Sequence, residues 1–218
     1  GDWDRRNRLK VYEAVHLLAT RQLARAAQLF LDTLATFTCT ELFPYSQFIF
    51  YTVLLAALSL ERVQLKEKVL DAPEVLASID QVPHLRQYVH AFYSSSYAEF
   101  FEALAALQTR ARLDQFLAPH ASFIVREMRV RAYAQLLQSY RSLQLSSMAQ
   151  AFRVSDEFLD RELSRFIASG RLHCHIDKVR GIVTTTRPDS RNQLYATTIR
   201  DGDLLLNRIQ KLSRVINI

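Results

Sequence analysis

The chain has 218 residues and is poor in glycine, proline and cysteine. Four glycines and five prolines are too few for a turn-rich all-β fold or for a phosphate loop built from glycine. Two cysteines, Cys39 and Cys174, supply neither a disulfide framework nor a four-thiolate zinc site, so we expect reduced thiols in an intracellular protein. No signal peptide opens the chain, and the longest apolar run, residues 48–60, is too short to cross a bilayer.

What the sequence does contain, over residues 1–143, is a series of helical patterns. Apolar residues recur at helical spacing over residues 3–20, 23–37, 44–60, 97–112 and 119–143, with shorter helices between 64 and 93. The segments 23–34 and 97–107 resemble each other, as in stacked helical hairpins. We therefore expect a mainly α fold that begins with a right-handed array of hairpins of the TPR or HEAT type. In the last helix, Glu127 and Arg131 have the spacing of an ion pair. The arginines Arg126, Arg129, Arg131 and Arg141 could bind phosphates, and a solvent-facing charged surface is the favoured interpretation.

The pattern changes after residue 143. Residues 144–187 predict helix, turn, helix, strand, turn and strand, which is the order of a winged helix. We expect Ser146 and Ser147 to cap the first helix, and Ser155 the second. Gly170 follows the second helix at a position that favours left-handed backbone. Alternation over 172–177 and β-branched residues over 182–186 predict the two strands.

Residues 188–218 are predicted to contain a linker, a short extended piece at 193–195, and a helix from about residue 197 to the end. The helix carries a heptad seam of residues spaced three and four apart: Gly202, Leu205, Ile209, Leu212 and Ile216. Such a seam suits bundling with other chains, and it equally suits packing against the helix's own domain. The spacing leaves both interpretations open.

The sequence offers one short run of metal-ligating residue types, His173-Cys174-His175. On a strand the two histidines point to one face, which Asp177 shares, and Cys174 points to the other. No second ligand pair is spaced to complete a site, so we interpret the histidines as structural or solvent-facing. Motifs for a nucleophilic serine, a phosphate loop or a dinucleotide are missing from the sequence as well. We therefore predict no catalytic, cofactor or metal site.

The positive charge of the second half of the chain could indicate nucleic-acid binding. Residues 111–218 carry 17 Lys and Arg against 10 Asp and Glu, whereas residues 1–110 carry 11 against 12. A basic half is typical of proteins with an acidic partner, although it can also be an incidental surface excess. Winged helices that bind DNA place their second helix in the major groove. Here that helix opens with Asp156, Glu157 and Asp160, which repel phosphates. Protein docking is therefore favoured, and nucleic-acid binding is the alternative.

Helical hairpins followed by a winged helix and a C-terminal helix resemble the PCI domain, which the proteasome lid, the signalosome and a translation initiation factor share. The run Ser147-Met148-Ala149-x-x-Phe152-x-Val154 is similar to the family's first winged-helix element, and residues 163–179 are similar to its second helix and first strand. Five runs resemble the proteasome-lid members in particular: residues 1–12, 125–129, 139–143, 187–190 and 202–217. The resemblance spans the whole chain and is weakest over 45–115.

The resemblance implies a non-catalytic scaffold of the proteasome regulatory-particle lid, which supports ubiquitin-dependent proteolysis in the cytoplasm and nucleus. A signalosome scaffold subunit is the alternative within the family. The implied partners are other PCI-domain lid subunits, with non-ATPase regulatory subunits 11 and 3 as neighbours, and the small acidic lid protein. No cofactor, nucleic acid or membrane is implied.

The resemblance also implies two assembly interfaces. The first is formed by the winged-helix strands, at Leu172, His173, Cys174, His175, Ile176, Asp177, Ile182, Val183, Thr184 and Thr185. The second is the C-terminal seam, at Leu205, Ile209, Leu212 and Ile216. We expect Thr184 and Thr185 to lie at an outer edge of the sheet, where unpaired backbone groups can accept a neighbouring strand.

Overall fold

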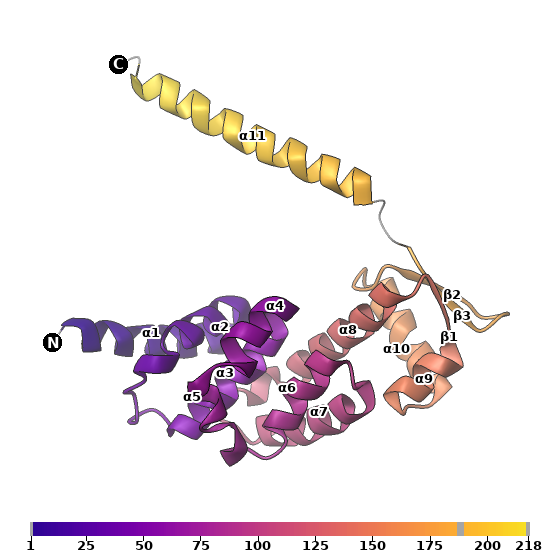
Figure 1. Cartoon of the computed structure of the whole chain (residues 1–218), viewed down its shortest axis with the longest axis horizontal. Helices are drawn as coiled ribbons and strands as arrows, with labels where there is room; N and C mark the ends of the chain where they lie inside the picture. The colour runs from indigo at the N-terminus through magenta and orange to yellow at the C-terminus, as the bar shows by residue number, and fades with distance from the viewer. Residues whose placement is uncertain (1, 187–189, 217–218) are drawn as a thin grey trace.

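The computed structural model describes the backbone of residues 2–186 and 190–216 and the side chains of residues 2–186 and 194–213. Figure 1 shows stacked helices from the N-terminus, a small winged helix at the far end of the stack, and one long helix, α11, that stands apart from both. The mainly α fold with a winged helix and a C-terminal helix is confirmed.

Eight helices form the array: α1 (Asp2–Ala19), α2 (Leu23–Asp32), α3 (Tyr45–Ser59), α4 (Arg62–Leu65), α5 (Pro73–Leu76), α6 (Leu85–Ser94), α7 (Tyr97–Arg112) and α8 (Ala121–Ser139). The winged helix contains β1 (Ser142–Gln144), α9 (Leu145–Phe152), α10 (Asp156–Ala168), β2 (Cys174–Asp177) and β3 (Ile182–Thr185). Helix α11 covers Ser190–Ile216. Within the array, α1 packs on α2, α2 on α3, and α6 on α7, as expected for stacked hairpins.

One continuous hydrophobic core joins the array and the winged helix. It runs from Val11 in α1 to Val183 in β3, and no described residue of α11 belongs to it. Helix α3 lies at its centre, with every side chain from Phe48 to Ala57 buried, because its apolar residues cover all sides of the helix. The array and the winged helix are therefore one packed body.

Aromatic side chains close the joint between the two parts. Phe152, at the end of α9, is fully buried among the rings of Tyr97, Phe101 and Tyr133, with ring centroids 4.7–4.8 Å apart. These three rings come from α7 and α8. Aromatic pairs at such distances add about 0.5–1.5 kcal/mol each beyond their buried area, so Phe152 fixes α9 against the array.

Buried polar groups hold α8 to elements on both sides. On the array side, the Arg131 guanidinium donates to the carbonyl oxygens of Ala57 and Leu60, at 2.8 and 2.7 Å. On the winged-helix side, Glu162 accepts from Arg129 at 2.5 Å and from the Tyr133 hydroxyl at 2.7 Å. Burial, together with the Glu162 carboxylate, raises the pKa of Tyr133 above its ordinary value.

The predicted ion pair between Glu127 and Arg131 is wrong. Arg131 turns toward the C-terminal end of α3, where carbonyl groups lack helical partners, and Glu127 instead accepts from Arg171 after α10. Arg129, expected to face solvent, is bound to Glu162. Helical spacing predicts which residues can meet along one helix, but it says nothing of partners that other helices bring closer.

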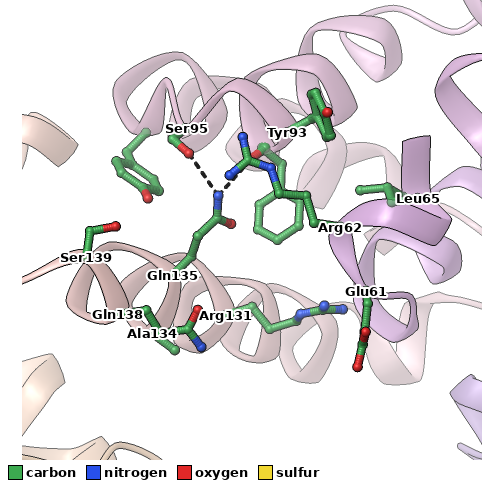
Figure 2. A pocket seen from close by; sticks show the side chains of 12 residues that line it. Glu61, Arg62, Leu65, Tyr93, Ser95, Arg131, Ala134, Gln135, Gln138 and Ser139 are labelled. Carbon is green, nitrogen blue, oxygen red and sulfur yellow. Dashed lines mark hydrogen bonds between the residues drawn. The ribbon is translucent and has the colours of Figure 1, made fainter. Parts of the chain in front are cut away.

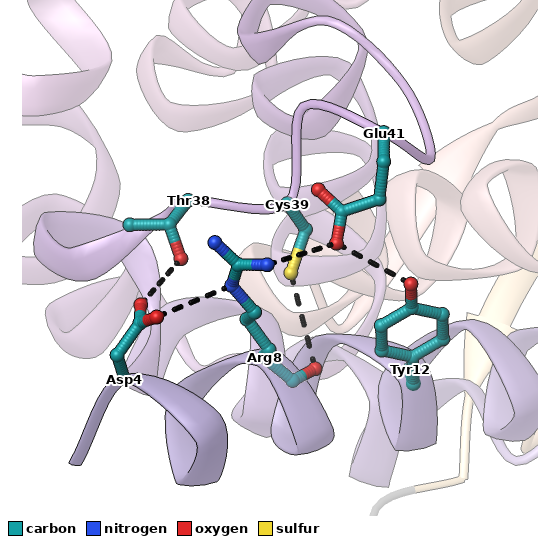
Figure 3. A network of polar contacts seen from close by, with 6 residues as sticks. All are labelled: Asp4, Arg8, Tyr12, Thr38, Cys39 and Glu41. Atoms are coloured by element: carbon teal, nitrogen blue, oxygen red, sulfur yellow. Dashed lines mark hydrogen bonds and ion pairs between the residues drawn. The ribbon is translucent and has the colours of Figure 1, made fainter. Parts of the chain in front are cut away.

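A polar network ties the loop after α2 to the first helix (Figure 3). Thr38 donates to Asp4 at 3.1 Å, and Glu41 accepts from the Tyr12 hydroxyl at 3.3 Å and lies 3.8 Å from Arg8. Cys39 is fully buried between them, and this burial raises the pKa of its thiol. The charged groups are half exposed, so their pairing contributes at most about 1 kcal/mol to the free energy of unfolding. Burial of apolar groups in the loop contributes more to holding it against α1.

Several predicted boundaries differ from the structure. The helix expected over 119–143 ends at Ser139, because Leu143 pairs with Val183 as part of strand β1. Helix α9 begins at Leu145 after Gln144, so neither Ser146 nor Ser147 caps it.

Two other local predictions are confirmed, and a third is wrong. The Ser155 hydroxyl accepts from the Phe158 amide at the start of α10, and Gly170 has left-handed backbone. Helix α11 begins at Ser190, so the extended piece expected at 193–195 is helical.

The Glu162 contacts generate a stability prediction. Glu162→Gln removes the charge that Arg129 faces and weakens the bond to Tyr133, in a site where the Glu162 side chain is 14% exposed. We expect the free energy of unfolding in urea to fall by about 1–3 kcal/mol. The matched control is Glu102→Gln, which breaks an exposed pair with Arg153 and should change the free energy by less than about 0.5 kcal/mol. Equal losses for both variants would contradict this assignment.

Candidate assembly interfaces

The three strands of the winged helix form an antiparallel sheet in the order β1-β3-β2. Strand β3 lies in the middle: Val183 is paired with Leu143 of β1 on one side and with Ile176 of β2 on the other. The amide of Thr185 donates to the Arg141 carbonyl at 3.0 Å, which extends the ladder toward β1. The sheet therefore has two outer edges, at β1 and at β2.

This strand order corrects the expectation for Thr184 and Thr185. Both residues lie in the middle strand, so their backbone groups are not at an outer edge of the sheet. The same holds for Ile182 and for Val183, which is fully buried. The sequence could not reveal this, because the pairing that covers β3 comes from the three-residue strand β1, which has no strand signature of its own.

Strand β2 retains the expected edge. The Thr186 amide donates to the His173 carbonyl at 3.1 Å, so His173 faces β3. In an antiparallel pair, the backbone groups of successive residues point alternately toward and away from the partner strand. The backbone amide and carbonyl of His175 therefore also point toward β3, whereas those of Cys174 and Ile176 point outward.

The side chains of this strand alternate as predicted. Leu172 and Cys174 are buried, whereas His173 and His175 are exposed. Burial raises the pKa of the Cys174 thiol. The Asp177 carboxylate accepts from the amides of Val179 and Arg180 at 3.0 and 3.1 Å and thereby shapes the turn to β3. Asp177 thus has a structural role at the end of the strand.

Helix α11 carries the second expected interface. Along its described side chains, Leu205, Ile209 and Leu212 are 60%, 56% and 64% exposed, although they form the predicted seam. The backbone of Ile216 is part of the helix, and its side chain lies outside the described residues. In this structure the winged helix does not cover Leu205, Ile209 and Leu212, and α11 stands apart from it (Figure 1).

The apolar face of α11 is wider than the seam predicted from sequence. Leu194 lies eleven residues before Leu205, about three helical turns, so it extends the seam toward the N-terminus. Tyr195, Ile199 and Leu206 form an adjoining stripe, and all are more than half exposed. Leu194 and Tyr195 were not predicted to share this face, because the predicted helix began at about residue 197 and the observed one begins at Ser190.

The second helix of the winged helix is acidic at its start, as the sequence indicates. Asp156 and Glu157 are exposed in its first turn. Asp160 pairs with Lys178 at 3.0 Å, and Glu162 pairs with Arg129. These two carboxylates are therefore neutralised by basic side chains of the same chain. The surface that would meet DNA bases therefore carries unpaired negative charge.

Figure 2 shows a hollow of about 470 Å³ between α4, the turn from α6 to α7, and α8. The Gln135 amide donates to the Ser95 hydroxyl at 2.9 Å on one wall, and the Arg62 guanidinium lies over the Tyr93 ring, 4.9 Å from its centroid. The residues that line it include no histidine, cysteine or aspartate. Within the described part of the chain, no three His, Cys, Asp or Glu side chains gather around a point where a metal ion fits.

Three protein-family models match the chain in succession. Residues 1–68 match 26S proteasome subunit RPN7, residues 85–187 match the PCI domain, and residues 195–216 match the C-terminal helix of 26S proteasome regulatory subunit RPN7/PSMD6. The second match covers α6 to β3, and the third lies within α11. Among residues 2–186 and 190–216, no helix has the length and apolar content needed to span a membrane.

Curated relatives agree over the whole chain. 26S proteasome non-ATPase regulatory subunit 6 of Oryza sativa subsp. japonica is 55% identical over 218 residues, which are 100% of this chain and 56% of the relative. The protein of the same name in Dictyostelium discoideum is 53% identical over 100% of this chain and 57% of its own length. COP9 signalosome complex subunit 1 of Arabidopsis thaliana is 32% identical over 70% of this chain and 35% of its own length.

The chain spans about half the length of the proteasome relatives it matches. The three matched segments occur in the order that the fold itself shows, with helical hairpins, then a winged helix, then a separate terminal helix. The chain therefore belongs to the PCI-domain proteins, within the RPN7 family of 26S proteasome regulatory subunits.

Proposed function

We propose that this chain is a scaffold segment of the proteasome regulatory-particle lid, which assembles through its winged helix and its C-terminal helix and performs no catalysis. In this role it supports ubiquitin-dependent protein degradation, in the cytoplasm and nucleus. The observation that carries the proposal is the uncovered apolar face of α11. A long helix that exposes Leu205, Ile209 and Leu212 needs a partner for that face.

The magnitudes favour bundling of α11 with other chains. Each of these side chains contributes about 1.5–3 kcal/mol when fully buried. An isolated helix gains little stability from its backbone alone, so a 27-residue helix is held mainly by whatever packs on it. Three or more such residues then outweigh the cost of ordering the helix in an assembly.

The proposed partners are other PCI-domain lid subunits. The free edge of β2 supports pairing with a neighbouring winged helix, because its outward amides and carbonyls can extend the sheet. We propose non-ATPase regulatory subunits 11 and 3 as neighbours, and the small acidic lid protein as a further partner of the basic half.

Two alternatives have weaker support. A signalosome scaffold is less favoured, because the signalosome relative matches 70% of the chain at 32% identity, against 100% at 55% for the proteasome relative. A nucleic-acid-binding winged helix is disfavoured by Asp156 and Glu157 at the exposed start of α10. Nothing in the winged helix requires a membrane, a cofactor or a nucleic acid for the scaffold role.

The edge of β2 gives one test. Ile176→Pro removes an outward amide, whereas Ile176→Ala removes a similar amount of the half-buried side chain and keeps that amide. We expect the proline variant to capture about tenfold less of the neighbouring lid subunits in a pull-down than the alanine variant. Thr184→Pro should instead unfold the winged helix, because it removes a bond from the middle strand. Equal capture by the two Ile176 variants would rule out edge pairing.

The apolar face of α11 gives a second test. Ile209→Glu with Leu212→Glu places two charges in the seam and should abolish incorporation into reconstituted lid. The melting temperature of the isolated chain should change by less than about 2 °C, because both side chains are already exposed there. The matched control, Asn207→Glu with Lys211→Gln, changes the net charge by the same amount on the opposite side of the helix and should incorporate normally. Loss of incorporation in both variants, or a melting temperature many degrees lower, would contradict the assignment.

A further inference from the structure

A second cavity, of about 510 Å³, lies between α8 and the C-terminal half of α10, outside both assembly interfaces. Four arginines line it: Arg126 and Arg129 from α8, Arg165 from α10, and Arg171 from the turn that follows. The hydroxyl of Ser122 lies at its edge. Four guanidiniums around one hollow are unusual, because like charges repel unless counter-charges are present.

Carboxylates of the chain neutralise only two of the four. Glu162 accepts from Arg129, and Glu127 accepts from both terminal nitrogens of Arg171, one of them at 2.7 Å. Arg126 and Arg165 are exposed and have no carboxylate within ion-pair distance among the described residues. Arg126 lies over the Phe123 ring, 5.4 Å from its centroid, which leaves its charge uncompensated.

The cavity is thus rich in hydrogen-bond donors, and its lining has no free carboxylate. Its one lining carboxylate, Glu162, has both oxygens engaged, one by Arg129 and the other by the Tyr133 hydroxyl. Two uncompensated positive charges match a phosphate monoester, which carries a charge of about −1.5 to −2 at neutral pH and three acceptor oxygens. A single carboxylate would leave one of the two charges unmatched.

The two engaged arginines give the site a rigid frame. Arg129 is held by a carboxylate that is 14% exposed, and Arg171 by one that is 12% exposed. Val125 and Phe166, which are buried, are the apolar residues of the lining. Guanidinium groups fixed in this way bind phosphate oxygens with less loss of side-chain freedom than mobile lysines would.

We propose that this cavity, lined by Arg126, Arg129, Arg165 and Arg171, binds a phosphorylated serine or threonine side chain of a partner protein. Arg126 and Arg165 supply the charge for the phosphate, with Ser122 as a further donor, and the volume of the cavity admits the phosphorylated side chain with part of its backbone. The site lies between α8 and the C-terminal half of α10, away from the acidic start of that helix, so the basic half of the chain has a specific anionic ligand. The inference stands independently of lid assembly.

The test uses the whole chain and three capped tripeptides of the form Gly-X-Gly, in which X is phosphoserine, serine or glutamate. Binding is followed by NMR of the arginine Nε–H groups at about 150 mM salt. We expect the phosphoserine peptide to shift the Arg126 and Arg165 signals saturably, with a dissociation constant at least about tenfold lower than that of the glutamate peptide. The serine peptide should produce no shift.

The test variant is Arg126→Gln with Arg165→Gln, which changes exposed residues and should fold normally. Its affinity for the phosphoserine peptide should fall by at least about tenfold. The matched control, Arg112→Gln with Arg161→Gln, loses the same charge from exposed positions on α7 and α10 and should bind as the unchanged chain does.

Three results would overturn the proposal. These are equal affinity for the phosphoserine and glutamate peptides, equal loss of binding in both double variants, and shifts that never saturate. Tighter binding of a single-stranded oligonucleotide at the same Arg126 and Arg165 signals would also overturn it, because the ligand would then be a nucleic-acid backbone.

Discussion

The fold depends on the anchoring of helix α8 from two sides. Arg131 binds the carbonyl groups of Ala57 and Leu60 at the end of α3, and two residues to either side of it Arg129 and Tyr133 bind Glu162 of α10. Each group would be costly to bury alone, because an unsatisfied charge or hydroxyl loses its hydration without replacement. Together with the rings around Phe152, these bonds make the array and the winged helix one body.

Helix α11, in contrast, lies outside the packed body formed by the array and the winged helix. Its described apolar side chains, among them Leu205, Ile209 and Leu212, are all more than half exposed and share no core with the residues that α8 organises. The same chain therefore contains one part whose polar and apolar groups are satisfied internally and one part whose apolar face is not. This division is what a scaffold requires: a firm winged helix that presents a strand edge, and a helix whose stability comes from its neighbours.

The sequence predicted those features that depend on local chemistry. The helix at Tyr97–Arg112 and the Ser155 cap were readable because spacing and capping act within a few residues. The features that it did not predict depend on distant partners. Strand β1 exists because Leu143 pairs with Val183, forty residues later, and this pairing moves Thr184 from the edge to the middle of the sheet. Phosphate binding by Arg126 and Arg129 was an alternative from the sequence, but the cavity itself could not be predicted, because Arg165 and Arg171 come from elements that only the fold brings near them.

We propose that α8 belongs to the internally satisfied body, whereas α11 is stabilised by partner chains. Hydrogen–deuterium exchange of the isolated chain measures this directly, since protection reports the free energy of local opening. We predict strong protection over 121–139 and little protection over 194–213, where amide hydrogens should exchange within about a minute, as in a marginally stable helix. Protection of 194–213 as strong as that of 121–139 would contradict the account, because α11 would then be covered by its own chain.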